Sequence, residues 1–216
     1  GAMGALIALA LAGWLTRLAT PLLAAPDPAG LPWLVAPLGA SAVLVFVLPA
    51  SPLAQPWPVL GGDLISAAIG VGLGLAVPEP ALAAGLALAA AIAAMSLLRC
   101  LHPPGGACAL LGALSAQGAW HGALLTLACN LAVLIAIGWL WNNLTGHTWP
   151  HRQPMIPQAP MPVSLRTYEA ADLDAVLEEW DEVLDVNRHD LDALFRAVER
   201  RVRQRQDTGG SFSGTK

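Results

Sequence analysis

Long runs of apolar residues alternate with short clusters of proline and glycine along the first 150 positions of the chain. Four of these runs approach the roughly 20 residues that a helix needs to cross a membrane. They predict membrane-spanning helices over 2–23, 61–77, 81–101 and 120–143. Two shorter apolar runs, 38–48 and 107–116, each follow a proline break and predict helices that cover about half of the hydrocarbon core. Tryptophans flank several runs and are expected in the belts at the membrane surface, at Trp33, Trp57, Trp120, Trp139, Trp141 and Trp149.

The two short runs begin with similar phrases, PLGASAVL at 37–44 and PGGACALL at 104–111, which are identical at five of eight positions. Each half of the membrane region therefore has the order long helix, proline break, half-helix and long helix, and we expect two internal repeats. Paired half-helix starts at matching places are typical of a transport site. The sequence leaves open whether each half-helix completes a crossing, which makes the repeats inverted, or returns to its own side, which makes them parallel.

The composition also indicates a membrane protein, since 56% of the residues are hydrophobic and 12% are charged, about half the charged share of a soluble domain. The net charge of -4 comes mainly from the tail, and no basic patch suggests a nucleic-acid partner. An even number of crossings, followed closely by Arg152 and Arg166, predicts that both termini are cytoplasmic. The charged side chains before position 151 are Arg17, Asp27, Asp63, Glu79 and Arg99.

The chain divides into a membrane region and a water-facing tail. Apolar positions recur at helical spacing in the tail, and Asn187 followed by Asp190 is a plausible helix start. The apolar faces of this hairpin are expected to pack on each other or on a second subunit, and a regulatory role is the less favoured alternative. The expected divisions are a transmembrane domain at 1–149, a proline-rich linker at 150–165, a cytoplasmic two-helix hairpin at 166–205 and a disordered tail at 206–216.

The starts of the two half-helices form the candidate substrate site. A helix N-terminus carries about half a positive charge together with unpaired N–H groups, so two starts that face one point suit a monovalent anion. The alternative interpretation is that both phrases are helix breaks that allow close packing. The expected substrate-binding residues are Gly39, Ala40, Ser41, His102, Gly105, Gly106 and Ala107.

Polar residues near these starts have two interpretations each. His102 either donates to the anion and changes charge near neutral pH, or satisfies a carbonyl that the break sets free. Arg17 is expected to reach the membrane surface, whereas Arg99 either does the same or guards the anion path. Asp63 is interpreted most simply as the N-cap of its helix and is also a candidate pathway residue.

The sequence predicts no catalytic residues, no metal site and no cofactor. It contains no evident pairing of a nucleophile with a base, no metal-ligand spacing and no phosphate loop, so we expect no enzyme activity. Cys100, Cys108 and Cys129 lie among small or aliphatic residues and are expected to pack rather than to form disulfides. So few spans also predict a homo-oligomer, because one subunit would struggle to enclose a solvated path.

Three segments, 36–44, 49–56 and the His-Pro-Pro-Gly-Gly sequence at 102–106, together resemble the HPP family of integral membrane proteins. The resemblance extends over nearly all of 1–145 and implies a protein with four membrane spans. Because plant and cyanobacterial members are associated with nitrite transport, it also implies a transporter or channel for a small inorganic anion similar to nitrite.

Two departures accompany this resemblance. A histidine is common in the family where this chain has Asp63, which removes the imidazole at that position. The tail at 173–196 resembles the segment that leads into paired CBS nucleotide-binding modules in longer members, and without those modules we expect no nucleotide site. We expect an integral protein of the bacterial inner membrane that contacts the lipid bilayer, a small anion and further copies of itself. The alternative function is a membrane scaffold or sensor that signals through the tail.

Overall fold

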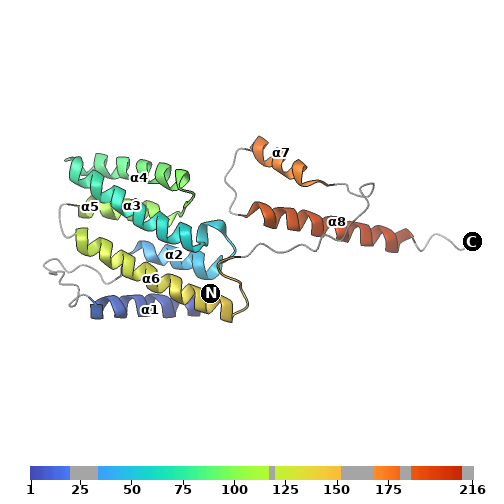
Figure 1. Cartoon of the computed structure of the whole chain (residues 1–216), viewed down its shortest axis with the longest axis horizontal. Coiled ribbons are helices and arrows are strands. Elements are labelled where there is room, and N and C mark those ends of the chain that lie inside the picture. The colour runs from blue at the N-terminus through green and yellow to red at the C-terminus, as the bar shows by residue number, and fades with distance from the viewer. Residues whose placement is uncertain (20–33, 117–119, 152–167, 181–185, 211–216) are drawn as a thin grey trace, which may run out of the picture. The chain divides into compact units, whose positions relative to one another are not determined.

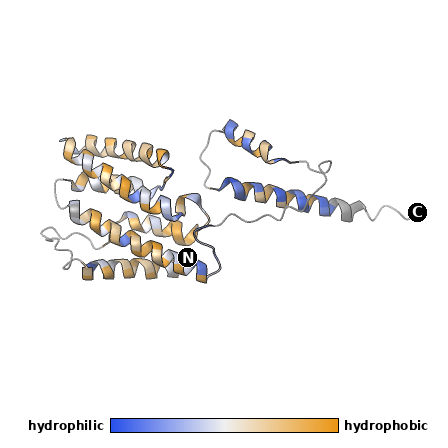
Figure 2. Cartoon of the chain, viewed as in Figure 1, coloured by the Kyte–Doolittle hydropathy of each residue, from blue (hydrophilic) through white to orange (hydrophobic). Residues whose placement is uncertain are grey.

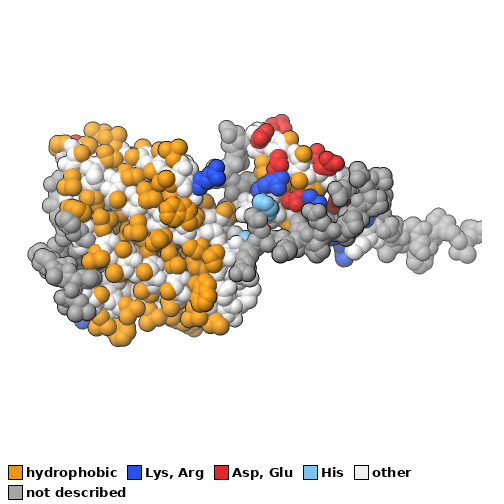
Figure 3. Space-filling model, in the orientation of Figure 1, with side chains coloured by type: hydrophobic (Ala, Val, Ile, Leu, Met, Phe, Trp, Pro, Cys, Tyr) orange, Lys and Arg blue, Asp and Glu red, His pale blue; other side chains and the backbone are white. Residues whose placement is uncertain are grey.

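The computed structural model describes residues 1–19, 34–116, 120–151, 168–180 and 186–210. The chain divides into two compact units, Gly1–His151 and Arg152–Lys216, and each is described by itself. Hydrophobic side chains cover the face of the first unit that Figure 3 shows, whereas acidic and basic side chains gather in the second. Colouring by hydropathy shows the same contrast between their helices (Figure 2).

Four helices of the first unit are long and apolar enough to cross a membrane: α1 (Ala2–Ala19), α3 (Pro56–Ala76), α4 (Pro80–Leu97) and α6 (Trp120–Leu144). Two apolar helices are shorter, α2 (Pro37–Val47) and α5 (Pro104–Ser115), and a 3-10 turn, η1 (Pro52–Ala54), precedes α3. This confirms the prediction of an all-helical membrane protein with four long spans. The order long, short, long occurs twice along the described chain (Figure 1), while the internal sequence repeat stays a prediction.

Prolines set where several of these helices begin. Proline suits the first turn because that position needs no N–H partner and its backbone angle is already helical. The prediction that a helix opens at 61–63 is wrong, since α3 begins at Pro56 with Gln55 as its N-cap. Asp63 is therefore not an N-cap. It lies in the interior of α3, roughly 10 Å from the start at ~1.5 Å per residue.

Glycines on α3 and α5 let these two helices pack backbone to backbone. A Cβ built at Gly70 would overlap the carbonyl oxygen of Ala109, and one at Gly112 would overlap the carbonyl oxygen of Ala67. Small residues at such contacts are typical of membrane helices, where close van der Waals packing drives association. Ala87 and Ala91 of α4 pack against these two helices and complete a small apolar core.

Contacts along α3 fix the directions of its neighbours. Gly105, at the start of α5, lies against Gly62, and Ala113, near its end, lies against Gly74, so α5 runs in the same direction as α3. By contrast, the Trp57 indole donates to the carbonyl of Leu98 at 3.2 Å, which brings the end of α4 to the start of α3. Residues 98–115 therefore return from the end of α4 to its beginning.

The first half has the same arrangement around α1. Phe46, at the end of α2, lies against Gly4, and Leu34, before α2, lies against Gly13. Residues 34–47 therefore return from the end of α1 to its start. The two short helices therefore run in opposite directions within the unit, while the crossing of the membrane by each half-helix stays a prediction. The start of α1 and the end of α6 lie at the same end of the unit, where Asn142 donates to the carbonyl of Val45.

The segment after α6 folds back onto the first unit. Trp149 is 1% exposed, and its indole donates to the carbonyl of Ala54 at 3.1 Å. Its expected place in a membrane-surface belt is therefore wrong, because a neighbouring turn supplies a buried acceptor. Trp57 and Trp139 are 51% and 56% exposed, as a lipid-facing role requires.

The second unit contains α7 (Ala170–Trp180) and α8 (Arg188–Gly210). Asn187 accepts a hydrogen bond from the backbone N–H of His189 at 2.9 Å, as an N-cap does. The Tyr168 ring stacks on Phe195, and its hydroxyl donates to Asp192 at 3.0 Å. Helix α8 extends to Gly210, past position 205 where we expected the hairpin to end. Residues 211–216 and most of the expected linker lie outside the described residues.

Candidate functional site

Both short helices begin with the same pair of backbone hydrogen bonds. Before α2, Leu38 donates to Val35 and Gly39 donates to Ala36, each at 3.1 Å. The corresponding bonds before α5 join Gly105 to His102 at 2.9 Å and Gly106 to Pro103 at 3.1 Å. The residues just before each short helix therefore form a hydrogen-bonded turn.

This turn changes the predicted anion site. The expected cradle needed unpaired N–H groups in the first turn, but those of Leu38, Gly39, Gly105 and Gly106 already have carbonyl partners. The positive end of each helix dipole remains, because it arises from all the aligned peptide units. Side chains must therefore supply any polar contacts at the two starts.

Three polar side chains meet at this place and are fully buried: Ser41 of α2, Asp63 of α3 and His102, which lies just before α5. The Ser41 hydroxyl lies 3.0 Å from Asp63 Oδ2 and 2.9 Å from His102 Nε2. The other ring nitrogen, His102 Nδ1, lies 2.8 Å from the carbonyl oxygen of Leu53 in η1. We name these three residues the polar cluster.

Two oxygens beside the hydrogen bonds of the cluster have no partner among the described residues. They are Asp63 Oδ1 and the hydroxyl of Ser66, one turn further along α3, and both are buried. The Cys108 thiol of α5 adjoins the Asp63 carboxyl group, where it can serve as a weak donor. A buried polar atom without a partner costs free energy, so these oxygens mark a place where a further group can bind.

The polar cluster contains the residue types of a hydrolase triad but not its geometry. In a triad the imidazole lies between the hydroxyl and the carboxylate. Here the hydroxyl lies between the other two groups, and a backbone carbonyl holds His102 Nδ1. The sequence argument that no nucleophile lies beside a base is wrong, since Ser41 and His102 are in contact. The Ser41 hydroxyl is nevertheless 0% exposed, so a substrate acyl group has no access to it.

The remaining predicted site residues separate into two groups. Gly39, Ala40 and Ala107 are exposed on the first unit, and no described atom lies within 4 Å of a Cβ built at Gly39. Gly105 is buried, and its Cβ would meet the carbonyl oxygen of Gly62 at 2.7 Å, so this glycine serves packing. Gly106 is half-buried beside Leu88 of α4.

The two arginines of the membrane unit lie at helix ends and are exposed. Arg99 follows α4 with φ of 52°, in the left-handed region. Its N–H donates to Ser96 and the N–H of Cys100 donates to Met95, which is the Schellman arrangement that usually employs glycine. Arg99 therefore ends α4 and turns the chain toward His102.

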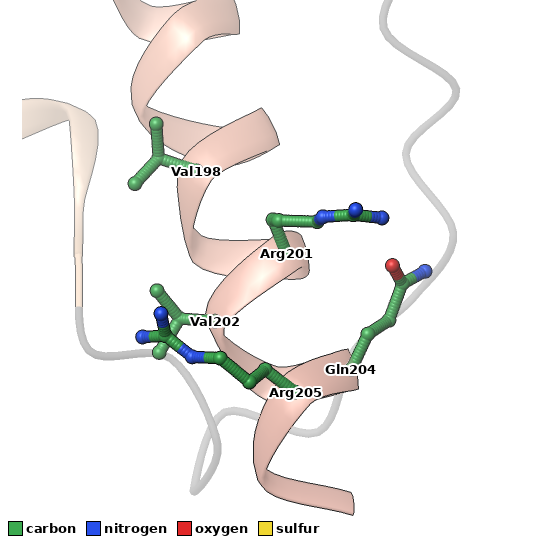
Figure 4. Close-up of a pocket in the computed structure, with 5 residues that line it drawn as sticks. All are labelled: Val198, Arg201, Val202, Gln204 and Arg205. Carbon is green, nitrogen blue, oxygen red and sulfur yellow. The ribbon is translucent and has the colours of Figure 1, made fainter. Parts of the chain in front are cut away.

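Two cavities lie elsewhere. One, of about 540 Å³, is lined by apolar residues of α6 together with Trp149 and Pro56. The other, of about 880 Å³, lies along α8, where Arg201 and Gln204 point away from Val198 and Val202 (Figure 4). Neither is lined by a residue of the polar cluster. No group of three His, Cys, Asp or Glu side chains suited to a metal occurs within the described ranges.

Comparison with known proteins supports the membrane assignment. Residues 1–150 match the family described as "HPP, transmembrane region". A transmembrane protein of Dictyostelium discoideum is 40% identical over 94 residues, which is 42% of this chain and 30% of that protein. A second one from the same organism is 37% identical over 93 residues, 41% of this chain and 33% of its own length. The matches thus span about a third of these curated relatives. No solved structure matches the chain.

Proposed function

The chain belongs to the HPP family of transmembrane proteins, and from this premise we propose that it transports a small inorganic anion, similar to nitrite, across the membrane. The observation that carries the proposal is that α2 and α5 begin beside each other inside the membrane unit, where Ser41 and His102 are in contact. Both helices direct the positive ends of their dipoles toward this junction. Ionisable side chains buried in membrane helices commonly mark ion paths.

In this proposal the anion approaches along the exposed first turns at Gly39, Ala40 and Ala107 and binds beside Ser41 and His102, where the positive ends of the two helix dipoles meet. The two unpartnered oxygens on α3 show that the junction is polar beyond the hydrogen bonds already formed. Because the backbone N–H groups of the first turns are engaged, the side chains and the helix dipoles supply the attraction.

Anion flux into liposomes that contain the purified protein tests this proposal. We expect nitrite to enter, and we expect Gly39→Leu to abolish entry because its side chain would fill the approach to α2. Gly85→Leu is the matched control, since Gly85 is also an exposed helical glycine with no described atom within 4 Å of its Cβ. Equal flux in both variants would remove Gly39 from the path, and no flux in the wild type would overturn the proposal.

We further propose that the working unit is a homo-oligomer with both termini in the cytoplasm of a bacterial cell. The exposed first turns support the oligomer, because a second copy would enclose them. The shared location of the start of α1 and the end of α6 supports the placement of both termini on one side. Native mass spectrometry and labelling of cysteines placed at the two termini test these points separately.

A second candidate function is a scaffold or sensor that signals through the tail. It is favoured by apolar side chains on α7 and α8 that stay exposed in the second unit, with Val176, Leu194, Phe195 and Val198 between 42% and 57% exposed. Deletion of 152–216 distinguishes the two candidates. Anion flux should persist if transport belongs to the membrane unit, whereas loss of a cellular response with flux intact would favour signalling.

A further inference from the structure

The hydrogen-bond contacts of the polar cluster require one more proton than neutral histidine and ionised aspartate possess. A backbone carbonyl only accepts, so His102 Nδ1, at 2.8 Å from Leu53 O, carries a hydrogen. The Ser41 hydroxyl has a single hydrogen but lies within hydrogen-bond distance of both His102 Nε2 and Asp63 Oδ2. In one of these two contacts the hydrogen must therefore come from His102 or from Asp63 instead of Ser41.

With one added proton, two arrangements satisfy both contacts, and the longer contact from Ser41 Oγ to the Pro37 carbonyl oxygen, at 3.4 Å, is then left without a hydrogen. In the first, Ser41 donates to His102 Nε2 and a protonated Asp63 donates to Ser41. In the second, Ser41 donates to an ionised Asp63 and a doubly protonated His102 donates to Ser41. Both contain the same atoms and have zero net charge. They interconvert when the Asp63 proton moves to Ser41 Oγ while the Ser41 proton moves to His102 Nε2.

We propose that the polar cluster binds one exchangeable proton and that this proton accompanies the transported anion. The cluster carries one negative charge when the proton leaves and none when the proton is bound. An anion near Asp63 is repelled in the first state and admitted in the second, because interactions between charges are strong in a poorly solvated interior. The proton and the anion thus move together, one of each. This coupling rests on the proposed transport function, whereas the proton site itself does not.

The described residues around the polar cluster supply no positive charge that could neutralise Asp63 in place of the proton. His102, at 3.7 Å between Nε2 and Asp63 Oδ2, is the only base recorded as an ion-pair partner of Asp63 within the described residues. The other titratable group beside Asp63 is the thiol of Cys108 on α5. Cys100 after α4 lies against Gly61, and Met95 of α4 lies against Gly62. None of these groups brings a positive charge. The unpartnered Asp63 Oδ1 is a second oxygen of the same carboxyl group that can accept a proton.

Infrared spectroscopy of the full-length protein tests the proton site without any transport. At neutral pH we expect either a carboxylic acid band that disappears in Asp63→Asn or an imidazolium band that disappears in His102→Gln. Raising the pH should remove this band in the wild type. Ionised Asp63 together with neutral His102 at neutral pH would overturn the proton site, whatever the protein transports.

Liposomes with a pH indicator inside test the coupling. We expect nitrite entry through the wild type to acidify the interior with one proton per anion, beyond the leak of protein-free vesicles, and an imposed pH gradient to drive nitrite accumulation. Asp63→Asn, which has nearly the same size, should lose gradient-driven accumulation, while Glu79→Gln, at an exposed turn before α4, should keep it. Nitrite flux in Asp63→Asn that still responds to the pH gradient would overturn the coupling, and a wild type without flux would contradict transport alone.

Discussion

Gly70 of α3 lies directly against the backbone carbonyl of Ala109 on α5, with no space between them for even a methyl group. This contact holds α5 parallel to α3 and so fixes the depth at which α5 begins. Because His102 lies just before that start, its height beside Asp63 depends on the same contact. The geometry of the polar cluster is therefore set by packing between glycine-bearing helices.

Replacing Gly70 by alanine should destabilise the membrane unit. The added Cβ would overlap the Ala109 carbonyl, and forced overpacking costs about 1–3 kcal/mol or more. Gly72→Ala on the same helix is the control, because no described atom lies within 4 Å of its Cβ; it should stabilise by roughly 0.5–1 kcal/mol through helix propensity. Thermal unfolding in one detergent measures both. Similar stability of the two variants would contradict the close α3–α5 contact.

Two buried serines should respond oppositely to removal of the hydroxyl. Ser41→Ala leaves His102 Nε2 and Asp63 Oδ2 without their shared partner, and each unsatisfied buried polar group costs about 1–3 kcal/mol. Ser66→Ala removes a hydroxyl that has no partner among the described residues, so it should be neutral or stabilising. The comparison uses thermal unfolding at one pH. Greater destabilisation by Ser66→Ala would show that its hydroxyl has the more important contacts.

Arg99 adopts a backbone conformation that favours glycine, so Arg99→Gly should stabilise the protein. The left-handed conformation costs an ordinary residue about 1–2 kcal/mol, and most of this cost should be recovered. Gly146, with φ of 88° and no described atom within 4 Å of its Cβ, gives the reverse test, since Gly146→Ala should destabilise through the backbone alone. Anion flux into liposomes tests the other role of Arg99. If Arg99→Gly is stable but gives no anion flux, whereas Arg99→Lys gives flux, the positive charge of Arg99 is needed for anion entry.

Tyr168 provides a direct report on the second unit because it is the single tyrosine of the chain. Burial, and then its hydrogen bond to Asp192, raise the pKa of Tyr168 to about 12. Tyrosinate absorbance should therefore develop at higher pH than the usual ~10, and in Asp192→Asn it should develop earlier. The stabilising effect of this contact is complete below pH ~10 and is lost as the pH rises toward 12. Titration near pH 10 in the wild type would show that the contact is absent.

The sequence predicted the helices well where proline and apolar length act together, as at α2, α4 and α5. It failed at the start of α3, because the predicted helix at 61–77 left out Pro56 and Pro58 although proline is compatible with the first turn of a helix. Trp149 was misplaced for a different reason. An amphipathic ring fits both a membrane surface and a buried carbonyl, and the choice depends on a turn almost a hundred positions earlier.

The sequence named Ser41, His102 and Asp63 as candidates but could not predict the contacts between them. The paired phrases correctly indicated where two helices begin, yet they could not show that the first N–H groups are engaged or that Gly105 packs on Gly62. The contact between Ser41 and His102 joins residues 61 positions apart and depends on the register between helices. One signal was available: Asp63 is the carboxylate that lies within a predicted span, and burial of a charge in a membrane calls for a partner.

The opposite directions of α2 and α5 have an electrical consequence. The two helices run in opposite directions with their positive ends at the polar cluster, so a voltage along them acts on the two dipoles in opposite senses and the two effects nearly cancel. A charge that crosses the membrane gains or loses about 2.3 kcal/mol per 100 mV, but a proton and a monovalent anion that cross together carry no net charge. The proposed transport of one proton with one anion is therefore expected to be electroneutral, driven by the concentration and pH differences and indifferent to the membrane potential.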